Sequence, residues 1–367
     1  MVIFVAGGPL NPTEHQNIIV RRPEFDIILN NIENSDLYIA LTSPRQTGKT
    51  TLLYQIRSYL NKIGYGAVYI DLENYSELDE DSFYPELCDH INSRLFSLLE
   101  MECEESLNSK EIKDANKFFK YLCQLSESTP KARKLVLILD EIGGVPNEIS
   151  KAFFSTLRKV LGMSRSDEKE CLPYRKIFFI FSGALDLHKL TEGRNSPLSN
   201  VCQPPVSLDD FSKEQVLSLC RNLQGYSNIL TETISENIYK WCNGHPYLTQ
   251  RLLCLIEKNQ FFSDERLGEI SSRVENLVEK NLLFGKDSNL SNILHYLERN
   301  NTSARNSIFR ILYNKELKTV DHDDELLVAG LLRRLDDQCL DIRNQIYLEA
   351  LKIFFEKEEI TITNEKN

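Results

Sequence analysis

A glycine, a lysine and two threonines stand in a row at residues 48–51, between an apolar segment and a helical pattern. The apolar segment, LYIALT at 37–42, predicts a buried strand, and KTTLLYQI predicts a helix that begins at Lys49. Backbone N–H groups at such a strand–loop–helix junction bind phosphate. The pattern therefore predicts a P-loop, in which Lys49 reaches the β- and γ-phosphates of a nucleotide and Thr50 ligates magnesium.

The loop departs from the usual GxxxxGK[ST] pattern at its first position, because Ser43 stands where glycine is usual. Serine has less backbone freedom than glycine, so we expect a slightly altered loop geometry. A Gly/Pro turn that opens an ordinary helix is the alternative, but it leaves the strand, the Gly-Lys-Thr and the helix as a coincidence. The residues expected to bind nucleotide form the loop and the start of its helix: Ser43, Pro44, Arg45, Gln46, Thr47, Gly48, Lys49, Thr50 and Thr51.

Two acids, Asp140 and Glu141, end a second apolar segment within LVLILDEIGG. An aspartate at the carboxyl end of a strand can hold magnesium through water, and a glutamate beside it can polarise an attacking water. An apolar strand that ends in Asp-Glu is common, and a buried acidic pair without a catalytic role is the alternative. With a P-loop upstream, the pair predicts hydrolysis of ATP, with Thr50 and Asp140 as magnesium ligands and Glu141 as the general base.

Ser182 lies at the end of the apolar segment KIFFIFSG and is the third catalytic candidate, beside Glu141 and Lys49. In P-loop ATPases with an extra strand between the P-loop strand and the acidic strand, a polar residue at this place orients the water and senses the γ-phosphate. The segment GAVYIDL at 66–72 predicts such an extra strand. Ser-Gly also ends strands that have no catalytic role, so both interpretations of Ser182 stay open.

Four arginines are weaker candidates. Arg194 precedes the last predicted strand and would reach phosphate in its own chain or in a neighbouring subunit; a solvated surface arginine is the simpler explanation. Arg45 lies inside the loop, and its side chain is expected to point away from the nucleotide. Arg21 and Arg22 precede a helix that begins at Pro23, a segment that often forms the wall against which adenine packs.

The elements around these residues alternate between apolar strands and helices, which predicts helices wrapped on a parallel sheet. Three of the strands are continuous runs of β-branched and aromatic residues, typical of strands buried on both faces. The predicted strands cover 37–42, 66–72, 134–140, 176–183 and, least regular, 201–208. The predicted helices cover about 49–62, 81–100, 115–125 and 147–162.

Helical periodicity dominates beyond the last predicted strand. Ser212 predicts the start of one helix. Gly244 predicts the end of a second helix, and Pro246 the first turn of a third. A polar stretch at 287–292 predicts a joint. The remaining order is that of a winged helix, with helices at about 302–314 and 322–335, two short strands and a closing helix.

These elements predict an α/β P-loop NTPase with helices on both faces of a parallel sheet, followed by a helical region and a C-terminal winged helix. The predicted units are an N-terminal arm with the first helix (1–34), the P-loop ATPase core (35–206), the helical region (207–286), the winged-helix domain (287–360) and a tail (361–367).

The composition of the 367 residues is ordinary for a folded soluble protein, with 41% hydrophobic and 26% charged residues. The formal charge of −11 opposes long-range attraction to nucleic acid or anionic lipid. Nine cysteines without a CxxC pair argue against a zinc site or a disulfide framework. No apolar run approaches the ~18 residues of a membrane span, and the start has no basic leader, so we expect a cytoplasmic protein.

The motifs together resemble the AAA-like domain family of bacterial P-loop ATPases, which is related to the STAND signalling ATPases and to archaeal-type ATPases. The resemblance covers nearly the whole chain, and the motifs at its two ends are the more distinctive. It rests on FVAGGPLNP, IIVRRPEFDIIL, SPRQTGKTTLL, YIDLENY, LVLILDEIG, SPLSNVCQPPVSLDDFS, WCNGHPYLTQRLL and DIRNQIYLEAL.

The resemblance implies that the core is of the ASCE or AAA+-like type and that the helical region (207–286) is a lid. It also implies a switch, in which ATP bound with Mg²⁺ between core and lid holds one domain arrangement and ADP holds another. It places Gly244 and Pro246 beside the nucleotide as a Gly-x-Pro lid motif, in addition to their local role. Related lids carry an arginine where this chain has Tyr247, and Arg251 comes later in the helix, so a second sensor arginine is not expected. The sensor and effector modules common in the family are not found, so the effector would be a separate protein.

The leading functional hypothesis is a slow regulatory ATPase in bacterial defence or signalling, which acts through protein partners and through ATP-dependent homo-oligomers. The alternative is a nucleic-acid-associated ATPase, such as a loader or a transposition regulator, because a winged helix can bind DNA. The segment expected to form its recognition helix, HDDELLVAGLLRRL, begins with acids and offers only Arg333 and Arg334, which favours protein contact. A nucleotide-bound scaffold without hydrolysis is the third hypothesis, and the intact P-loop and acid pair argue against it.

Overall fold

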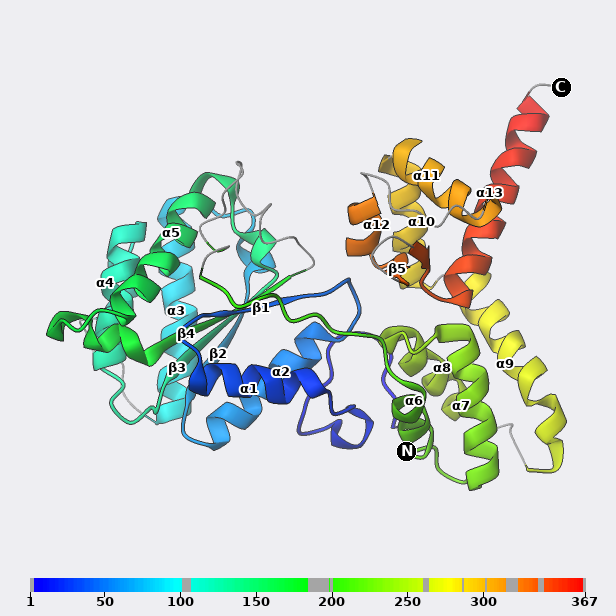
Figure 1. Cartoon of the computed structure of the whole chain (residues 1–367), viewed down its shortest axis with the longest axis horizontal. Coiled ribbons are helices and arrows are strands. Elements are labelled where there is room, and N and C mark those ends of the chain that lie inside the picture. The colour runs from blue at the N-terminus through cyan, green and yellow to red at the C-terminus, as the bar shows by residue number, and fades with distance from the viewer. Residues whose placement is uncertain are drawn as a thin grey trace.

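The computed structural model describes residues 3–100, 107–183, 198, 201–259, 264–285, 287–300, 302–314, 323–335 and 340–365. These residues form two lobes, each with its own hydrophobic core (Figure 1). Within the described ranges, no helix is long and apolar enough to cross a membrane.

The first lobe contains the predicted strands and helices with small changes at their ends. Its elements are α1 (Pro23–Asn34), β1 (Ile39–Thr42), α2 (Lys49–Lys62), β2 (Gly66–Asp71), α3 (Glu80–Leu99), α4 (Ala115–Glu127), β3 (Leu135–Asp140), α5 (Asn147–Ser164) and β4 (Ile177–Gly183). Two short 3₁₀ turns, η2 (Leu72–Tyr75) and η5 (Ile142–Gly144), follow β2 and β3.

The sheet of this lobe is parallel, in the order β1–β4–β3–β2, which confirms the predicted α/β fold. Within the described residues, the fifth predicted strand appears as two isolated parallel bridges, Tyr38–Cys202 just before β1 and Leu41–Val206 in β1. Every residue of β3 and β4 is buried. Figure 1 shows the reason, because α1 and α2 lie on one side of the sheet and α3, α4 and α5 lie on the other.

The strand that separates the P-loop strand from the acidic strand is β4, and not the predicted GAVYIDL strand. GAVYIDL forms β2, which pairs with β3 at the outer edge of the sheet. The prediction followed sequence order, whereas right-handed crossovers carry the chain out to the edge at β2 and then back toward β1. β4 fills the gap, and its Ser182 lies opposite Leu41 of β1.

The second lobe is mainly helical. Its elements are α6 (Lys213–Cys220), α7 (Asn228–Cys242), α8 (Pro246–Asn259), α9 (Ile270–Val278), α10 (Ser288–Asn300), α11 (Thr302–Phe309), α12 (Asp323–Val328), β5 (Leu332–Arg334), β6 (Leu340–Ile342) and α13 (Gln345–Glu365). The Ser212 side chain caps α6, and Pro246 is the first residue of α8, as predicted. Gly244 has the predicted left-handed backbone, with φ of 76°.

Three predictions about this lobe differ from the structure. The helix predicted over 322–335 ends at Val328, because Gly330 takes a left-handed backbone (φ 79°) and Leu332–Arg334 then pairs as β5. The polar stretch 287–292, which we predicted to be a joint, forms the start of α10.

The buried carboxylate of Asp287 accepts the backbone N–H of Asn289 at 3.0 Å and caps α10. α13 also continues to Glu365, into the residues predicted as a tail.

The N-terminal arm packs on the second lobe, although it precedes the first lobe in sequence. The backbone N–H groups of Ile3 and Phe4 donate to the Glu257 carboxylate of α8 at 2.8 and 2.9 Å. α1 belongs instead to the first core. The predicted unit 1–34 therefore contributes to both lobes. The apolar side chains that the arm adds to the second core are Phe4, Leu10 and Ile18.

Candidate functional site

Lys49 forms hydrogen bonds with the backbone of the P-loop itself. Lys49 is the first residue of α2 and only 5% exposed, and its Nζ donates to the carbonyls of Ser43 and Pro44 at 2.8 and 2.9 Å. An ammonium group has three N–H donors, so these two bonds leave one for a phosphate oxygen. Burial lowers the pKa of Lys49, while the charges of Glu141 and Asp140 oppose that shift. The loop is thus already folded around the cation that would meet the phosphates.

Ser43 changes the loop through a hydrogen bond and not through lost backbone freedom. The left-handed residues of the loop are Gln46 (φ 61°) and Gly48 (φ 91°), so the first position does not need glycine. The Ser43 hydroxyl, which is buried, accepts the backbone N–H of Leu208 at 2.6 Å. The expected alteration of loop geometry at Ser43 therefore has no basis in its backbone.

The acid pair meets the P-loop at the carboxyl end of β3. Asp140 is fully buried, and its Oδ2 accepts the Thr50 hydroxyl at 2.8 Å. The same oxygen accepts the Tyr69 hydroxyl of β2 at 2.9 Å. Burial, followed by the charge of Asp140, raises the pKa of Tyr69, so its proton stays in this bond. Tyr69 fixes the carboxylate and was not predicted, because an apolar strand with one tyrosine has no sequence signal for this contact.

Glu141 follows with a left-handed backbone (φ 48°), and its N–H donates to Asp140 Oδ1 at 3.1 Å. Burial, followed by the charge of Asp140, raises the pKa of the Glu141 carboxyl, whereas Lys49 and Arg45 oppose the shift. A raised pKa makes a carboxylate a better proton acceptor. The left-handed conformation is uncommon for glutamate and turns the chain at the end of β3, directly after Asp140.

Gly144 holds this bend against η2. A Cβ atom added to Gly144 would lie 2.5 Å from the carbonyl oxygen of Leu72 and 2.7 Å from the Cα of Glu73. Since η5 begins directly after Glu141, this close approach sets the path of the chain that carries Glu141. The second glycine of LVLILDEIGG is thus a residue of the site that the sequence did not single out.

We predict that Gly144→Ala destabilises the fold by about 1–3 kcal/mol, as overpacking does, and lowers turnover because Glu141 shifts. Thermal unfolding and a phosphate-release assay measure the two effects. Gly162→Ala is the matched control, because a Cβ on Gly162 in α5 meets nothing within 4 Å. That variant should be neutral or more stable by about 0.5–1 kcal/mol. Equal behaviour of the two variants would contradict the role of Gly144.

Ser182, the third catalytic candidate, lies near the end of β4. It is 1% exposed, and within the described residues its hydroxyl has no hydrogen-bond partner. A buried hydroxyl without a partner is costly, and such a group commonly serves a ligand. Together with the remaining N–H of Lys49 and the hard oxygens of Thr50 and Asp140, it makes a donor set that fits a nucleotide with magnesium.

The first turn of α2 also meets the N-terminal arm. The Thr51 hydroxyl accepts the backbone N–H of Leu10 at 3.1 Å. Arg22 is buried; it donates to the carbonyl of Thr47 at 2.8 Å and lies over the ring of Phe211 at 4.6 Å. Its guanidinium therefore supports the loop from outside, and does not offer an open wall for adenine.

The remaining described candidates form no hydrogen bond with the P-loop within the part of the chain that the structure describes. The Gly244 carbonyl accepts the N–H of Phe211 at 2.8 Å, and in the described part of the chain no hydrogen bond joins Gly244 or Pro246 to the P-loop. Arg251 pairs with Asp287 at 3.3 Å, and the Tyr247 hydroxyl bonds the same carboxylate. Arg21 forms an exposed ion pair with Asp26. Arg194 lies outside the described residues.

The second lobe reaches the P-loop through two of its segments. Asn289, in the first turn of α10, donates its side-chain N–H to the side chain of Gln46. Gly330, between α12 and β5, approaches so closely that an added Cβ would lie 3.2 Å from the Cβ of Pro44. The top of the loop is therefore in contact with the C-terminal part of the chain.

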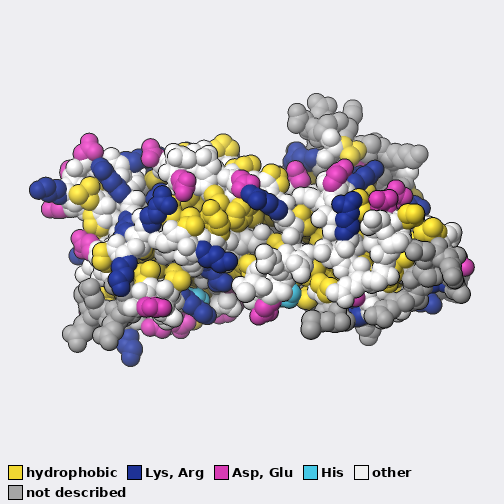
Figure 2. Space-filling model, turned by 90° about the horizontal axis from the view of Figure 1, so that it is seen from below, with side chains coloured by type: hydrophobic (Ala, Val, Ile, Leu, Met, Phe, Trp, Pro, Cys, Tyr) yellow, Lys and Arg dark blue, Asp and Glu magenta, His cyan; other side chains and the backbone are white. Residues whose placement is uncertain are grey.

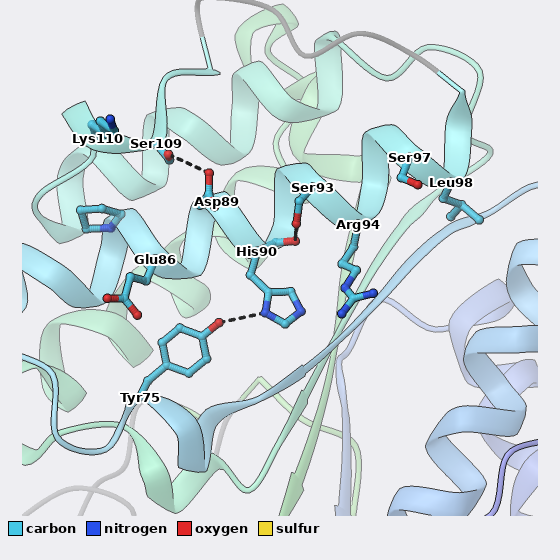
Figure 3. A pocket seen from close by; sticks show the side chains of 11 residues that line it. Tyr75, Glu86, Asp89, His90, Ser93, Arg94, Ser97, Leu98, Ser109 and Lys110 are labelled. Atoms are coloured by element: carbon cyan, nitrogen blue, oxygen red, sulfur yellow. Dashed lines mark hydrogen bonds between the residues drawn. The ribbon is translucent and has the colours of Figure 1, made fainter.

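A hollow of about 920 Å³ lies elsewhere, along α3 (Figure 3). Tyr75 and His90 meet there at 3.1 Å. Its lining includes both acidic and basic side chains but no residue of the P-loop or the acid pair, so it is not the nucleotide site. The charged residues of this lining are Glu86, Asp89, Arg94 and Lys110.

Known proteins resemble this chain over most of its length. A family model described as an AAA-like domain matches residues 9–349. A Walker-type ATPase of Pyrococcus abyssi has a similar structure over 96% of this chain and 100% of its own, with 17% identity and a TM-score of 0.62. The ORC2 protein of Aeropyrum pernix matches over 97% of each chain, with 11% identity and a TM-score of 0.46. No protein with curated annotation matches.

Proposed function

This chain belongs to the AAA-like domain family, and from that premise we propose that it is a regulatory ATPase, which binds ATP with Mg²⁺, hydrolyses it slowly and changes its domain arrangement as it does so. The observation that carries the proposal is the contact of Thr50 with Asp140 at 2.8 Å, beside a lysine that is buried in its own loop. These groups are the ones that a magnesium–nucleotide complex requires.

The residues of the site divide the work of hydrolysis. Lys49 would direct its remaining N–H and its charge at the phosphates, and Thr50 and Asp140 would hold the metal. Glu141 would accept the proton of the attacking water, and the Ser182 hydroxyl would orient that water or bond the γ-phosphate. When bound, magnesium would be held by Thr50 and Asp140 and would neutralise charge that develops on the phosphate oxygens.

The switch is supported by the contacts between the loop and the second lobe. Gln46 and Pro44 of the loop touch Asn289 and Gly330, so a change in the loop has a direct route to the C-terminal unit. We propose that this unit, 287–360, is a winged helix and that 207–286 is the lid. A cytoplasmic role in bacterial defence or signalling, a separately encoded protein partner and ATP-dependent self-assembly belong to the same proposal.

The test is amide hydrogen exchange of the Glu141→Gln chain with ATP and of the unchanged chain with ADP, each with Mg²⁺. We expect exchange in α10 and around Gly330 to differ between the two states, because the loop contacts these segments. A phosphate-release assay on the unchanged chain accompanies it. Identical exchange patterns would remove the switch, and no phosphate release would leave a nucleotide-bound scaffold.

A nucleic-acid role is the alternative function, and the second lobe gives it little support. The helix expected to enter a groove, α12, has six residues (Asp323–Val328) and begins with acids. Arg333 lies on β5 and pairs with Asp341 at 3.0 Å. On the face shown in Figure 2, Lys and Arg side chains are spread among acidic and apolar ones and do not form a stripe. A salt-dependent gel shift with duplex DNA and ATP would favour this alternative.

A further inference from the structure

Residues 208–211, the joint segment, lie where the chain leaves the sheet of the first lobe and enters the helices of the second (Figure 1). Each of its four residues is held by a different group. Two of these groups belong to or support the P-loop, and two belong to the second lobe. The joint segment is thus in contact with both parts that a nucleotide switch must connect.

The first two residues of the joint segment are hydrogen-bonded to the P-loop, one directly at the start of the loop and one through Arg22 near its end. The Ser43 hydroxyl accepts the N–H of Leu208 at 2.6 Å. Arg22 donates one N–H to the carbonyl of Asp209 at 2.7 Å and another to the carbonyl of Thr47 at 2.8 Å. Ser43 and Arg22 are both 6% exposed, so water does not compete freely for these bonds. A displacement of the loop is therefore passed to residues 208 and 209.

The last two residues of the joint segment are hydrogen-bonded to the second lobe. Arg343, which follows β6, binds the Asp210 carboxylate with two N–H groups, at 2.9 and 2.5 Å. The Arg343 side chain is 5% exposed and that of Asp210 is 18% exposed. The N–H of Phe211 donates to the Gly244 carbonyl at 2.8 Å. A Cβ on Gly244 would lie 1.9 Å from the Phe211 carbonyl oxygen, so the lid turn fits directly against the joint segment.

These contacts explain why the loop begins with serine. With glycine at position 43, the buried N–H of Leu208 would lose its partner, which is costly for a backbone group. The serine does not assist phosphate binding through its side chain, because that side chain is engaged with the joint segment. A residue that departs from the usual P-loop pattern is therefore the one that joins the loop to the exit of the sheet.

We propose that the joint segment transmits the nucleotide state of the P-loop to the second lobe, with Ser43 as the coupling residue on the loop and the Asp210–Arg343 pair as the contact that it controls. This inference rests on the proposed function of a nucleotide switch. It differs from the direct contact of Gln46 with Asn289, which bypasses the joint segment. The P-loop and the second lobe are thus connected by two sets of residues, and variants of each set can be compared.

The test is a double-mutant cycle on the dissociation constant of a non-hydrolysable ATP analogue with Mg²⁺. Asp210→Asn weakens the ion pair between the joint segment and Arg343 of the second lobe. In the structure, the second lobe is in contact with the P-loop. In the otherwise unchanged chain we expect it to raise the affinity about 5- to 10-fold, within the usual range of coupling between sites. In a Ser43→Gly background the same change should alter affinity less than about twofold, because the Ser43 contact to which we assign the coupling is already absent.

Three controls keep the result specific. Asn289→Ala acts on the direct contact, so its effect on affinity should be the same with serine or glycine at position 43. Ser126→Ala removes another buried serine bond, to the carbonyl of Pro173 at 2.7 Å, and should leave the Asp210→Asn effect intact. If Asp210→Asn lowers the melting temperature strongly, Arg343→Lys replaces it, because lysine keeps the charge but cannot form the paired bonds.

An equal effect of Asp210→Asn with serine and with glycine at position 43 overturns the coupling role while the nucleotide switch stands. If the unchanged chain does not bind the analogue, the proposed function fails and this inference fails with it. Ser43→Ala should behave as Ser43→Gly does, since both lack the hydroxyl. A loss of coupling with glycine but not with alanine would assign the effect to backbone freedom, and would also overturn the inference.

Discussion

Lys49→Ala should raise the dissociation constant for ATP about 10- to 150-fold, because a hydrogen bond to a charged group contributes about 1.5–3 kcal/mol. The Lys49 side chain is buried inside the loop. Its Nζ lies within the loop, bonded to the carbonyls of Ser43 and Pro44, with one N–H left for phosphate. Equilibrium binding of a fluorescent ATP analogue with Mg²⁺ measures the change.

The matched control for this variant is Lys62→Ala, at the exposed far end of the same helix. It removes the same side chain and the same charge from the protein, so it corrects for the change in net charge. Thermal unfolding of both variants separates a loss of binding from a loss of fold, since Lys49 also ties the loop together. Unchanged ATP affinity in a folded Lys49→Ala chain would refute the assignment of the P-loop.

Glu141→Gln should lower the turnover number by about 10²- to 10⁴-fold, the usual contribution of a general base, and leave ATP bound. Glutamine has the same size and keeps the N–H bond to Asp140, but its amide cannot accept a proton from water. Single-turnover phosphate release measures the rate, and retention of ATP on the protein shows the trapped state. Glu148→Gln, an exposed glutamate in the first turn of α5, is the control.

The same variant has a pH signature with a definite sign. The folded-state pKa of Glu141 is raised above the ordinary value by burial and by Asp140. The folded chain therefore binds more protons than the unfolded chain between the two pKa values, and stability falls as pH rises through that range. We expect Glu141→Gln to raise the melting temperature at neutral pH and to have no such effect below the ordinary glutamate pKa. In the unchanged chain, turnover should fall on acidification at a pH above that ordinary value.

The unpredicted contacts of the site share one property: each joins residues that are far apart in the sequence. Tyr69 reaches Asp140 across 71 residues, and Ser43 reaches Leu208 across 165. Gly144 matters because η2 packs on η5, which the sequence of neither segment indicates. Patterns of local periodicity contain no information on such pairs. The error over the extra strand has the same origin, because sequence order does not give the order of strands in a sheet.

The sequence by itself determined the strand–loop–helix of the P-loop, the acidic strand and the αL turn before Pro246. Each of these depends on residues that are neighbours in the chain, so their types and spacing are sufficient. Only the tertiary structure decided that β4 separates β1 from β3 and that the N-terminal arm packs on the second lobe. It also decided the role of Ser43, whose backbone needs no glycine and whose hydroxyl holds Leu208. Ser43 and Leu208 lie on different parts of the chain, and only the folding of the whole chain brings them within hydrogen-bond distance.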